Sequence, residues 1–188
     1  MRAYEPGDER SWLRCRVLGF LDTAYFDDVW TAKPSASGPD LVAVDGDGTV
    51  AGILTTSVRP GAATVDTVVV HPDFRRQGIG RALLDAVVAP LRAGGVAELD
   101  AWTRDDVGTL GWYRGMGFAE DSHYLHVYAN RYADGAEPER AELSARPGLK
   151  LMAGFLHGTM ADEAWARANF RRVHVCRRFV LPLTSGDG

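Results

Sequence analysis

A basic, glycine-rich stretch is the part of the chain whose residue types and spacing best suit chemistry. It contains Arg75, Gln77, Gly78, Gly80 and Arg81, follows three consecutive valines and precedes apolar residues at helical spacing. The first amides of a helix have no internal acceptor, and the helix dipole places partial positive charge there. Glycines let the backbone approach a ligand closely, and the arginines add full positive charge. The stretch therefore predicts a phosphate site, and a pyrophosphate suits it best.

Two common phosphate-binding motifs do not match this stretch. A P-loop needs Gly-Lys followed by Ser or Thr, whereas Gly80 is followed by Arg81 and Ala82. A Rossmann turn needs a third glycine at the position that Leu83 occupies. A purely structural interpretation stays open, in which the glycines only form the turn between a strand and a helix.

The spacing Arg75-x-x-Gly78-x-Gly80 after a strand resembles the acetyl-CoA loop of the GNAT N-acetyltransferases, whose pattern is Arg/Gln-x-x-Gly-x-Gly/Ala. A second stretch, residues 106–118, resembles the family's Asn-x-x-Ala-x-x-aromatic-Tyr-x-x-x-Gly-Phe signature, with Tyr113 on the tyrosine. Asp106 stands where the family has asparagine. The order of predicted elements resembles the family over residues 1–128.

The resemblance implies a mixed α/β (α+β) fold. Its central sheet is twisted, mixed and mostly antiparallel, is flanked by helices and has two central strands that splay apart to admit acetyl-CoA. The implied contacts are backbone pairing with the pantetheine arm, amide bonds to the phosphates and a contact from the asparagine position. The cofactor-binding residues are then Val68, Val70, Arg75, Gln77, Gly78, Ile79, Gly80, Arg81 and Asp106.

The implied reaction transfers an acetyl group directly from a thioester to an amine. An alkylamine has a pKa of about 10, so a base or a water relay must help to deprotonate it. We assign Tyr113 as the acid that protonates the leaving thiolate. Asp66 is the candidate base, because alternation along a strand places Asp66, Val68 and Val70 on one face. An exposed strand-start carboxylate or an ion pair would explain Asp66 equally well.

Aromatic and acidic residues after the first predicted helix are candidates for the acceptor pocket. Tyr25, Phe26, Asp28 and Trp30 would suit a cationic amine, although ordinary packing of the aromatic rings explains them too.

Histidines on strands expected to be neighbours raise a zinc hypothesis for His123, His126 and His174, but we expect no metal. The two cysteines, Cys15 and Cys176, have no ligand spacing and predict no disulfide.

Composition limits the class of protein. The net charge of −4 disfavours general nucleic-acid binding, and the 188 residues contain no apolar run of the ~18 that a membrane span needs. The first ten residues lack an apolar signal core, so we expect a cytoplasmic protein. We expect residues 1–188 to form a single domain, with an insertion at 130–171 before a last strand at 172–183.

Periodicity and turn residues predict the elements that would position the site. We expect a helix at residues 11–21, and residues 25–30 either continue it or form a second short helix. A further helix should run from 79 to about 93, with a kink or an end at Pro90. The last two helices are expected at 107–115, capped by Asp105 or Asp106, and at 161–170. We expect strands at residues 1–4, 41–44, 50–57, 63–70, 96–103, 123–128, 149–157 and 172–183, and a loop at 130–147.

The sequence thus predicts an acetyl-CoA-dependent N-acetyltransferase that acts on a small-molecule amine. A protein N-terminus or lysine stays open as the acceptor, and a homodimer is possible. The alternatives are an acyltransferase with another acyl-CoA or acceptor, a non-catalytic acetyl-CoA sensor or interaction module, and an ordinary nucleotide binder.

Overall fold

The computed structural model describes residues 1–130, 133–140 and 154–184. The strands are β1 (Arg2–Ala3), β2 (Asp40–Val44), β3 (Val50–Arg59), β4 (Ala62–Val70), β5 (Glu98–Thr103), β6 (Ala119–Ala129), β7 (Gly154–Gly158) and β8 (Arg172–Pro182). The helices are α1 (Glu9–Phe20), α2 (Ile79–Ala93), α3 (Val107–Gly115), α4 (Glu137–Arg140) and α5 (Glu163–Asn169). Short 3-10 turns lie at Pro6–Asp8, Pro72–Phe74 and Met160–Asp162.

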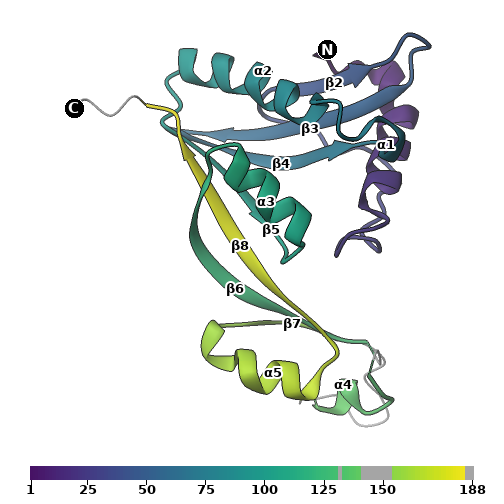
Figure 1. Ribbon diagram of the computed structural model, residues 1–188, viewed down its shortest axis with the longest axis vertical. Coiled ribbons are helices and arrows are strands. Elements are labelled where there is room, and N and C mark those ends of the chain that lie inside the picture. Colours follow the sequence, from purple (N-terminus) through teal and green to yellow (C-terminus); the bar gives the residue numbers. More distant parts are fainter. Residues whose placement is uncertain (131–132, 141–153, 185–188) are drawn as a thin grey trace.

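One eight-stranded mixed sheet, in the order β1-β2-β3-β4-β5-β8-β6-β7, organises the described residues. The pair β4 and β5 is parallel, and the other neighbouring pairs are antiparallel. In Figure 1, α1 and α2 lie with β2–β4, while the long strands β6 and β8 run down to β7 and α5. The predicted mixed, mostly antiparallel sheet flanked by helices is confirmed.

The two central strands separate along their length. Strands β4 and β5 pair only from Ala62 with Glu98 to Val65 with Ala101. Beyond Val65 and Ala101 the two strands part, and we call this place the strand fork. The predicted splaying of the central strands is therefore confirmed.

A β-bulge at the strand fork changes which way the residues of β4 face. On β3, Thr55 pairs with Thr67 and Thr56 pairs with Val65, so Asp66 has no partner in the β3 register. An unpaired residue of this kind breaks the alternation of side chains. Val68 packs in the cluster that contains Val65, whereas Asp66 bonds to Ser57, which pairs with Thr64 on the opposite face. The predicted placement of Asp66 and Val68 on one face is wrong.

Helices on opposite faces bury the apolar side chains of β3. Leu54 packs with Leu83 and Val87 of α2, whereas its neighbour Ile53 packs with Trp12 and Cys15 of α1. Burial of a leucine or isoleucine side chain of this kind stabilises the fold by roughly 1.5–3 kcal/mol. These two layers hold β4, and with it one wall of the strand fork, in place.

The far end of the sheet has an apolar cluster of its own. It joins α5 to β6 and β8 through Leu125, Val127, Ala166, Phe170 and Val173. This cluster uses one face of these strands, and the other face carries histidines and aromatic side chains.

One expectation for the helices is wrong. Residues 25–30 form no helix: turns cover 25–27, because the Thr23 hydroxyl bonds to the Phe20 carbonyl at 2.8 Å and accepts the Tyr25 amide at 3.1 Å. Helix α2 continues through Pro90 to Ala93 and ends at Gly94, so its predicted extent is confirmed and an end at Pro90 is excluded.

The remaining boundaries differ in detail. Strand β5 begins at Glu98 rather than at 96, and the strand predicted at 123–128 extends over Ala119–Ala129. The loop predicted at 130–147 includes α4, and residues 149–153 of the next predicted strand lie outside the described residues. The single-domain organisation with an insertion at 130–171 stays a prediction. Across the described parts of the chain, no helix is long and apolar enough to cross a membrane.

Candidate active site

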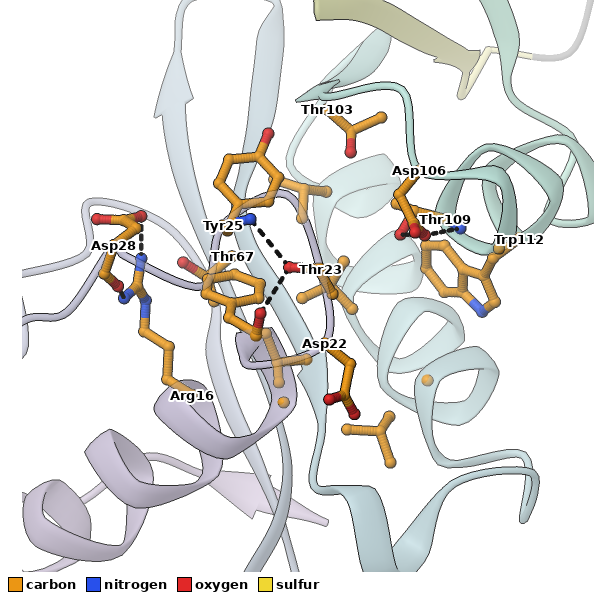
Figure 2. Close-up of a pocket in the computed structure, with 18 of the residues that line it drawn as sticks. Arg16, Asp22, Thr23, Tyr25, Asp28, Thr67, Thr103, Asp106, Thr109 and Trp112 are labelled. Carbon is orange, nitrogen blue, oxygen red and sulfur yellow. Dashed lines mark hydrogen bonds and ion pairs between the residues drawn. The ribbon is translucent and has the colours of Figure 1, made fainter. Parts of the chain in front are cut away.

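A pocket of about 660 Å³ lies at the strand fork. Its lining comes from β4, the ends of α1 and β5, the residues 21–30 that follow α1 (the 21–30 loop), α3 and the start of α2. Figure 2 shows Thr23 and Tyr25 of the 21–30 loop across the pocket from Asp106, Thr109 and Trp112. The pocket is therefore walled by segments that are far apart in the sequence.

The glycine-rich turn forms one end of the pocket. Gly78 is the N-cap of α2 and has a φ of 78°, in the left-handed region that favours glycine, and Arg76 has a φ of 63°. The first hydrogen bond of the helix runs from the Ala82 amide to the Gly78 carbonyl at 3.0 Å. The amides before Ala82 in this first turn have no acceptor within the helix. A Cβ on Gly78 would meet no atom within 4 Å, so the space beside this turn is open. The turn can hold an anion at its exposed amides.

The predicted cofactor residues of this turn occupy different places. Arg76 and Gly80 line the pocket, while Gln77, Gly78, Ile79 and Arg81 continue the same turn beside it. Gly80 lies against the Trp112 indole, and a Cβ added at Gly80 would be 3.4 Å from the indole Nε1.

Arg75 also lines the pocket, but its guanidinium holds α1. It donates to the Gly19 carbonyl at 2.9 Å and lies 3.7 Å from an Asp22 carboxylate oxygen. Arg75 therefore connects the glycine-rich turn to the end of α1.

Strand β4 supplies an open backbone edge. Val68 and Val70 line the pocket, and they pair with Leu54 and Gly52 of β3 on one side. On the side toward β5, no described strand pairs with β4 beyond Val65. The N–H and C=O groups of that edge are available to an extended, amide-containing ligand.

Tyr113 lies on α3 at the inner wall of the pocket. It is 4% exposed, and its ring stacks on Phe179 at 5.3 Å and meets Phe118 edge-on at 5.2 Å. Burial raises the pKa of its hydroxyl, and the neighbouring Tyr25 adds to this rise. The hydroxyl therefore carries its proton at neutral pH and can donate it.

The turn that begins α3 is fixed by Asp106. Its Oδ1 accepts from the amide and the hydroxyl of Thr109, both at 2.8 Å, so Asp106 is the N-cap. Gly117 ends the helix with a φ of 87°, and the Phe118 amide returns to the Tyr113 carbonyl at 3.1 Å. The cap predicted at Asp106 and the end predicted at Gly117 are confirmed.

Asp66 lines the pocket at the bulge of β4 and is exposed. Its Oδ2 accepts a hydrogen bond from the Ser57 hydroxyl at 2.6 Å. Partial burial raises the pKa of this carboxyl, the hydrogen bond from Ser57 opposes the rise, and the charge of Asp100 adds to it. A raised pKa makes a carboxylate a stronger base, so its role as the base stays a prediction with a physical reason.

The proposed acceptor residues split into two groups. Tyr25, Asp28 and Trp30 line the pocket, whereas Phe26 lies outside the lining, 4.6 Å from the Arg172 guanidinium. The Asp28 carboxylate already binds the Arg16 guanidinium at 2.6 Å and the Trp30 indole at 3.0 Å. Asp28 is therefore largely neutralised by Arg16, and the aromatic rings are better placed than Asp28 to meet an acceptor.

The three histidines of the zinc hypothesis do not form one cluster. His126 pairs with His174 across β6 and β8, but His123 pairs with Arg177. His174 bonds to Asp105 at 2.7 Å. Within residues 1–130, 133–140 and 154–184, no group of three or more His, Cys, Asp or Glu side chains could hold a metal ion.

The cysteines are buried and free. Burial raises the pKa of Cys15 to about 12 and also raises that of Cys176. Neither thiol is activated as a nucleophile.

Several pocket residues escape prediction from the sequence. Thr67, Trp102, Thr103 and Trp112 line the pocket, and the Arg104 guanidinium lies over the ring of Tyr25. Trp112 directly precedes Tyr113 in the second motif, and this position could have predicted that Trp112 lies at the pocket. The others have no motif, and their place follows from the strand fork.

Comparison with known proteins places this geometry in a family. The profile of the acetyltransferase (GNAT) family matches residues 9–118. The chain is 34% identical over 92 residues to the ribosomal protein bS18-alanine N-acetyltransferase of Escherichia coli (strain K12), which covers 48% of this chain and 61% of that protein. It is 36% identical over 103 residues to the mycothiol acetyltransferase of Salinispora arenicola, which covers 54% of this chain and 27% of that protein. The chain therefore spans less than two thirds of the length of either relative.

The fold has matches among solved structures. The crystal structure of the ribosomal-protein-S18-alanine N-acetyltransferase from Escherichia coli superposes with a TM-score of 0.61 at 18% identity, over 100% of this chain and 96% of that one. This likeness concerns the fold. Because the family profile covers more than half of the 188 residues, the chain belongs to the acetyltransferase (GNAT) family.

Proposed function

We propose that the chain is an acetyl-CoA-dependent N-acetyltransferase that transfers the acetyl group directly to a primary amine. One observation carries the proposal: a single pocket joins an anion-binding turn at Arg76 and Gly80 to a buried tyrosine hydroxyl and a carboxylate at the strand fork. Membership of the family and the names of the two curated relatives support it.

The chain's own residues fit acetyl-CoA along the length of the pocket. The amides of Gln77, Gly78, Ile79, Gly80 and Arg81 would hold the pyrophosphate, and the open edge of β4 at Val68 and Val70 would pair with the pantetheine amides. Asp106 is occupied by its own cap bonds to Thr109, so its cofactor contact would use the carboxylate oxygen that the cap leaves free. Acetyl-CoA supplies the activated acetyl thioester.

The transfer needs three proton movements that the site can support. Asp66, or a water next to it, would accept a proton from the ammonium group, and the neutral amine nitrogen would then attack the thioester carbonyl. A backbone amide of β4 near Val70 would donate to the oxyanion that forms. The C–S bond then breaks, Tyr113 would donate its proton to the departing thiolate, and the resulting phenolate would recover a proton from the new amide nitrogen. The burial that raises the pKa of Tyr113 keeps this proton in place until that step.

The acceptor is the part of the proposal with two candidates. A small-molecule amine would lie in the pocket against the aromatic rings of Tyr25, Trp30 and Trp102, which line it. A polypeptide amine is favoured by the surface that continues outward from the pocket, because Trp102 meets Tyr124 at 5.0 Å and Tyr124 meets His157 at 4.3 Å. The relative named for the alanine of ribosomal protein bS18 supports the second candidate.

Thiol release from acetyl-CoA tests the proposal. A panel of small primary amines, and peptides with free or blocked N-termini, would be assayed with acetyl-CoA and with longer acyl-CoAs. Turnover that depends on a free amine supports the enzyme, and the better substrate group decides between the two acceptors. Micromolar binding of acetyl-CoA without turnover over the whole panel would instead favour a sensor.

Two further predictions need their own measurements. Sedimentation of the purified protein would test the possible homodimer, and fractionation of cells would test the expected cytoplasmic location.

A further inference from the structure

Arg104 is a buried cation that differs from the other buried arginines around the pocket. It directly follows β5 and is 8% exposed. Arg16 pairs with Asp28 and Arg172 pairs with Asp27, each at 2.6 Å. Arg104 has no carboxylate within ion-pair distance among the residues that the structure describes, and no acceptor lies within reach of its Nε there. Asp27 is near enough for the charge of Arg104 to lower its pKa, but its carboxylate pairs directly with Arg172. Burying a guanidinium without a direct ionic partner is costly, so the other contacts of Arg104 must offset that cost.

Those contacts converge on the 21–30 loop. The Nη1 of Arg104 donates to the Ala24 carbonyl, and its Nη2 donates to the Tyr128 hydroxyl of β6. The guanidinium carbon lies 4.2 Å from the centroid of the Tyr25 ring. The backbone amide of the same residue donates to the Tyr25 hydroxyl at 3.1 Å. One residue therefore holds both the ring and the hydroxyl of Tyr25.

The 21–30 loop depends on such contacts because it has no helical hydrogen-bond ladder. Arg172 also donates to the Ala24 carbonyl, at 3.0 Å, and Arg16 donates to the Asp28 carbonyl at 2.5 Å. These two arginines fix the loop on either side of Tyr25. Of the contacts that these three arginines make with the described residues, Arg104 provides those with Tyr25 itself.

Tyr25, which Arg104 holds in place, lies close to the proposed reaction centre. Tyr25 and Tyr113 line the same pocket, and the charge of Tyr25 acts on the pKa of Tyr113. A phenol hydroxyl offers one donor and more than one acceptor site, and the Arg104 amide occupies one acceptor site. Thr103 is a second hydrogen-bond partner of this hydroxyl, so its O–H donor is the group that it can offer to an acceptor molecule beside Tyr113.

We propose that Arg104 is the positioning residue of the acceptor site: it holds Tyr25 and the 21–30 loop against the end of β5, so that the Tyr25 hydroxyl orients the acceptor amine beside Tyr113. The kinetic part of this inference rests on the proposed N-acetyltransferase function. The structural part, that Arg104 holds the loop, stands independently of that function.

Four variants separate these two parts. Arg104→Gln removes the charge and both bonds from the guanidinium, Arg104→Lys keeps the charge, and Tyr25→Phe removes only the hydroxyl. The matched control is Arg14→Gln, because Arg14 is an exposed arginine of α1 that lies outside the pocket lining. Each variant would be measured by hydrogen exchange of residues 21–30, by calorimetry with acetyl-CoA, and by steady-state kinetics. The acceptor probes are phenethylamine and a hexapeptide with a free N-terminal alanine, with thiol release in the absence of amine as a baseline.

We expect Arg104→Gln to speed exchange in residues 21–30 and to raise the KM for the acceptor probe about tenfold or more. Tyr25→Phe should raise the same KM with a smaller effect on exchange, and Arg104→Lys should recover part of both losses. The affinity for acetyl-CoA should stay within about twofold of wild type, since the glycine-rich turn makes no contact with Arg104. The Arg14→Gln control should match wild type throughout.

Several outcomes would overturn the inference. Wild-type exchange in residues 21–30 of Arg104→Gln would do so, and so would an acceptor KM unchanged in both Arg104→Gln and Tyr25→Phe. An equal loss of acetyl-CoA affinity would indicate a general structural role instead. If Arg104→Gln does not fold, the exchange rates of Arg104→Lys and the acceptor KM of Tyr25→Phe and Arg104→Lys decide whether the inference holds. If wild type binds no acetyl-CoA or uses neither probe, the proposed function or its acceptor range fails, while the exchange data still decide whether Arg104 holds the loop.

Discussion

Replacing Tyr113 by phenylalanine tests the chemistry with little disturbance of the fold. The ring is 4% exposed and packs against Phe118 and Phe179, and phenylalanine preserves these contacts. Within the described residues, the Tyr113 hydroxyl makes no hydrogen bond, so the substitution leaves no buried partner unsatisfied. We therefore expect the free energy of unfolding to change by less than about 1 kcal/mol.

The expected effect on catalysis is much larger. Loss of a general acid lowers the rate by roughly 100-fold or more, which corresponds to about 2.7 kcal/mol of barrier. The effect should fall on kcat, because the glycine-rich turn and the β4 edge that would bind acetyl-CoA are unchanged. The KM for acetyl-CoA should stay within about twofold of wild type under this reasoning.

The assay is thiol release at saturating acetyl-CoA and saturating amine, with calorimetry of acetyl-CoA binding alongside. Tyr4→Phe is the matched control, because Tyr4 packs against the cluster that contains Trp12 and Cys15 of α1, outside the pocket. This variant should give wild-type rates. An unchanged kcat in Tyr113→Phe would refute its role as the acid. A loss of acetyl-CoA affinity equal to the loss of rate would show that the hydroxyl acts in binding instead.

Three further predictions follow from the pKa values and the caps. Asp66→Asn should lower kcat/KM and remove the rise in activity as pH increases through the raised pKa of Asp66; a pH–rate profile like that of wild type would exclude it as the base. Burial, with the charge of Arg104, lowers the pKa of His126 to about 4 from 6.5. The unfolded chain therefore takes up a proton first, so the contribution of His126 to stability is complete above pH 6.5 and is lost as pH falls toward 4. Because the ring is only half-buried, solvent screening reduces this loss to about 2 kcal/mol. Denaturation of wild type and His126→Phe at pH 7 and 4.5 checks this, and equal losses in the two would contradict it. Asp106→Ala should cost about 1 kcal/mol of unfolding free energy by removing the cap of α3, and Asp106→Asn should cost less; equal melting temperatures for all three proteins would show that the cap contributes nothing.

Features with local sequence signals could be predicted. The turn at Gly78 and the start of α2 follow from helix-terminus chemistry, and the Asp106 cap and the Gly117 end follow from residue types that favour these positions. Tyr113 is placed at the pocket by its spacing from the same helix end. In each case the deciding contacts lie within a few residues.

Features that depend on distant contacts could not be predicted. The bulge at Asp66 arises from the register between β3 and β4, which alternation along one strand does not reveal. The 21–30 loop is held by Arg104 and Arg172, which lie far along the chain. The separation of His123 from His126 and His174 depends on the register of β6 and β8.

Calorimetry with acetyl-CoA and CoA, with ATP and NAD as controls, tests the proposed function most directly. We expect micromolar binding of acetyl-CoA to wild type and a loss of about tenfold or more in Gly78→Val, because valine strains the left-handed backbone at the turn. Gly48→Val serves as the matched control, because Gly48 also has a left-handed backbone, with a φ of 82°, and lies outside the pocket. No binding of acetyl-CoA to the folded wild-type protein, or equal binding of ATP and NAD, would contradict an acetyl-CoA site at the strand fork.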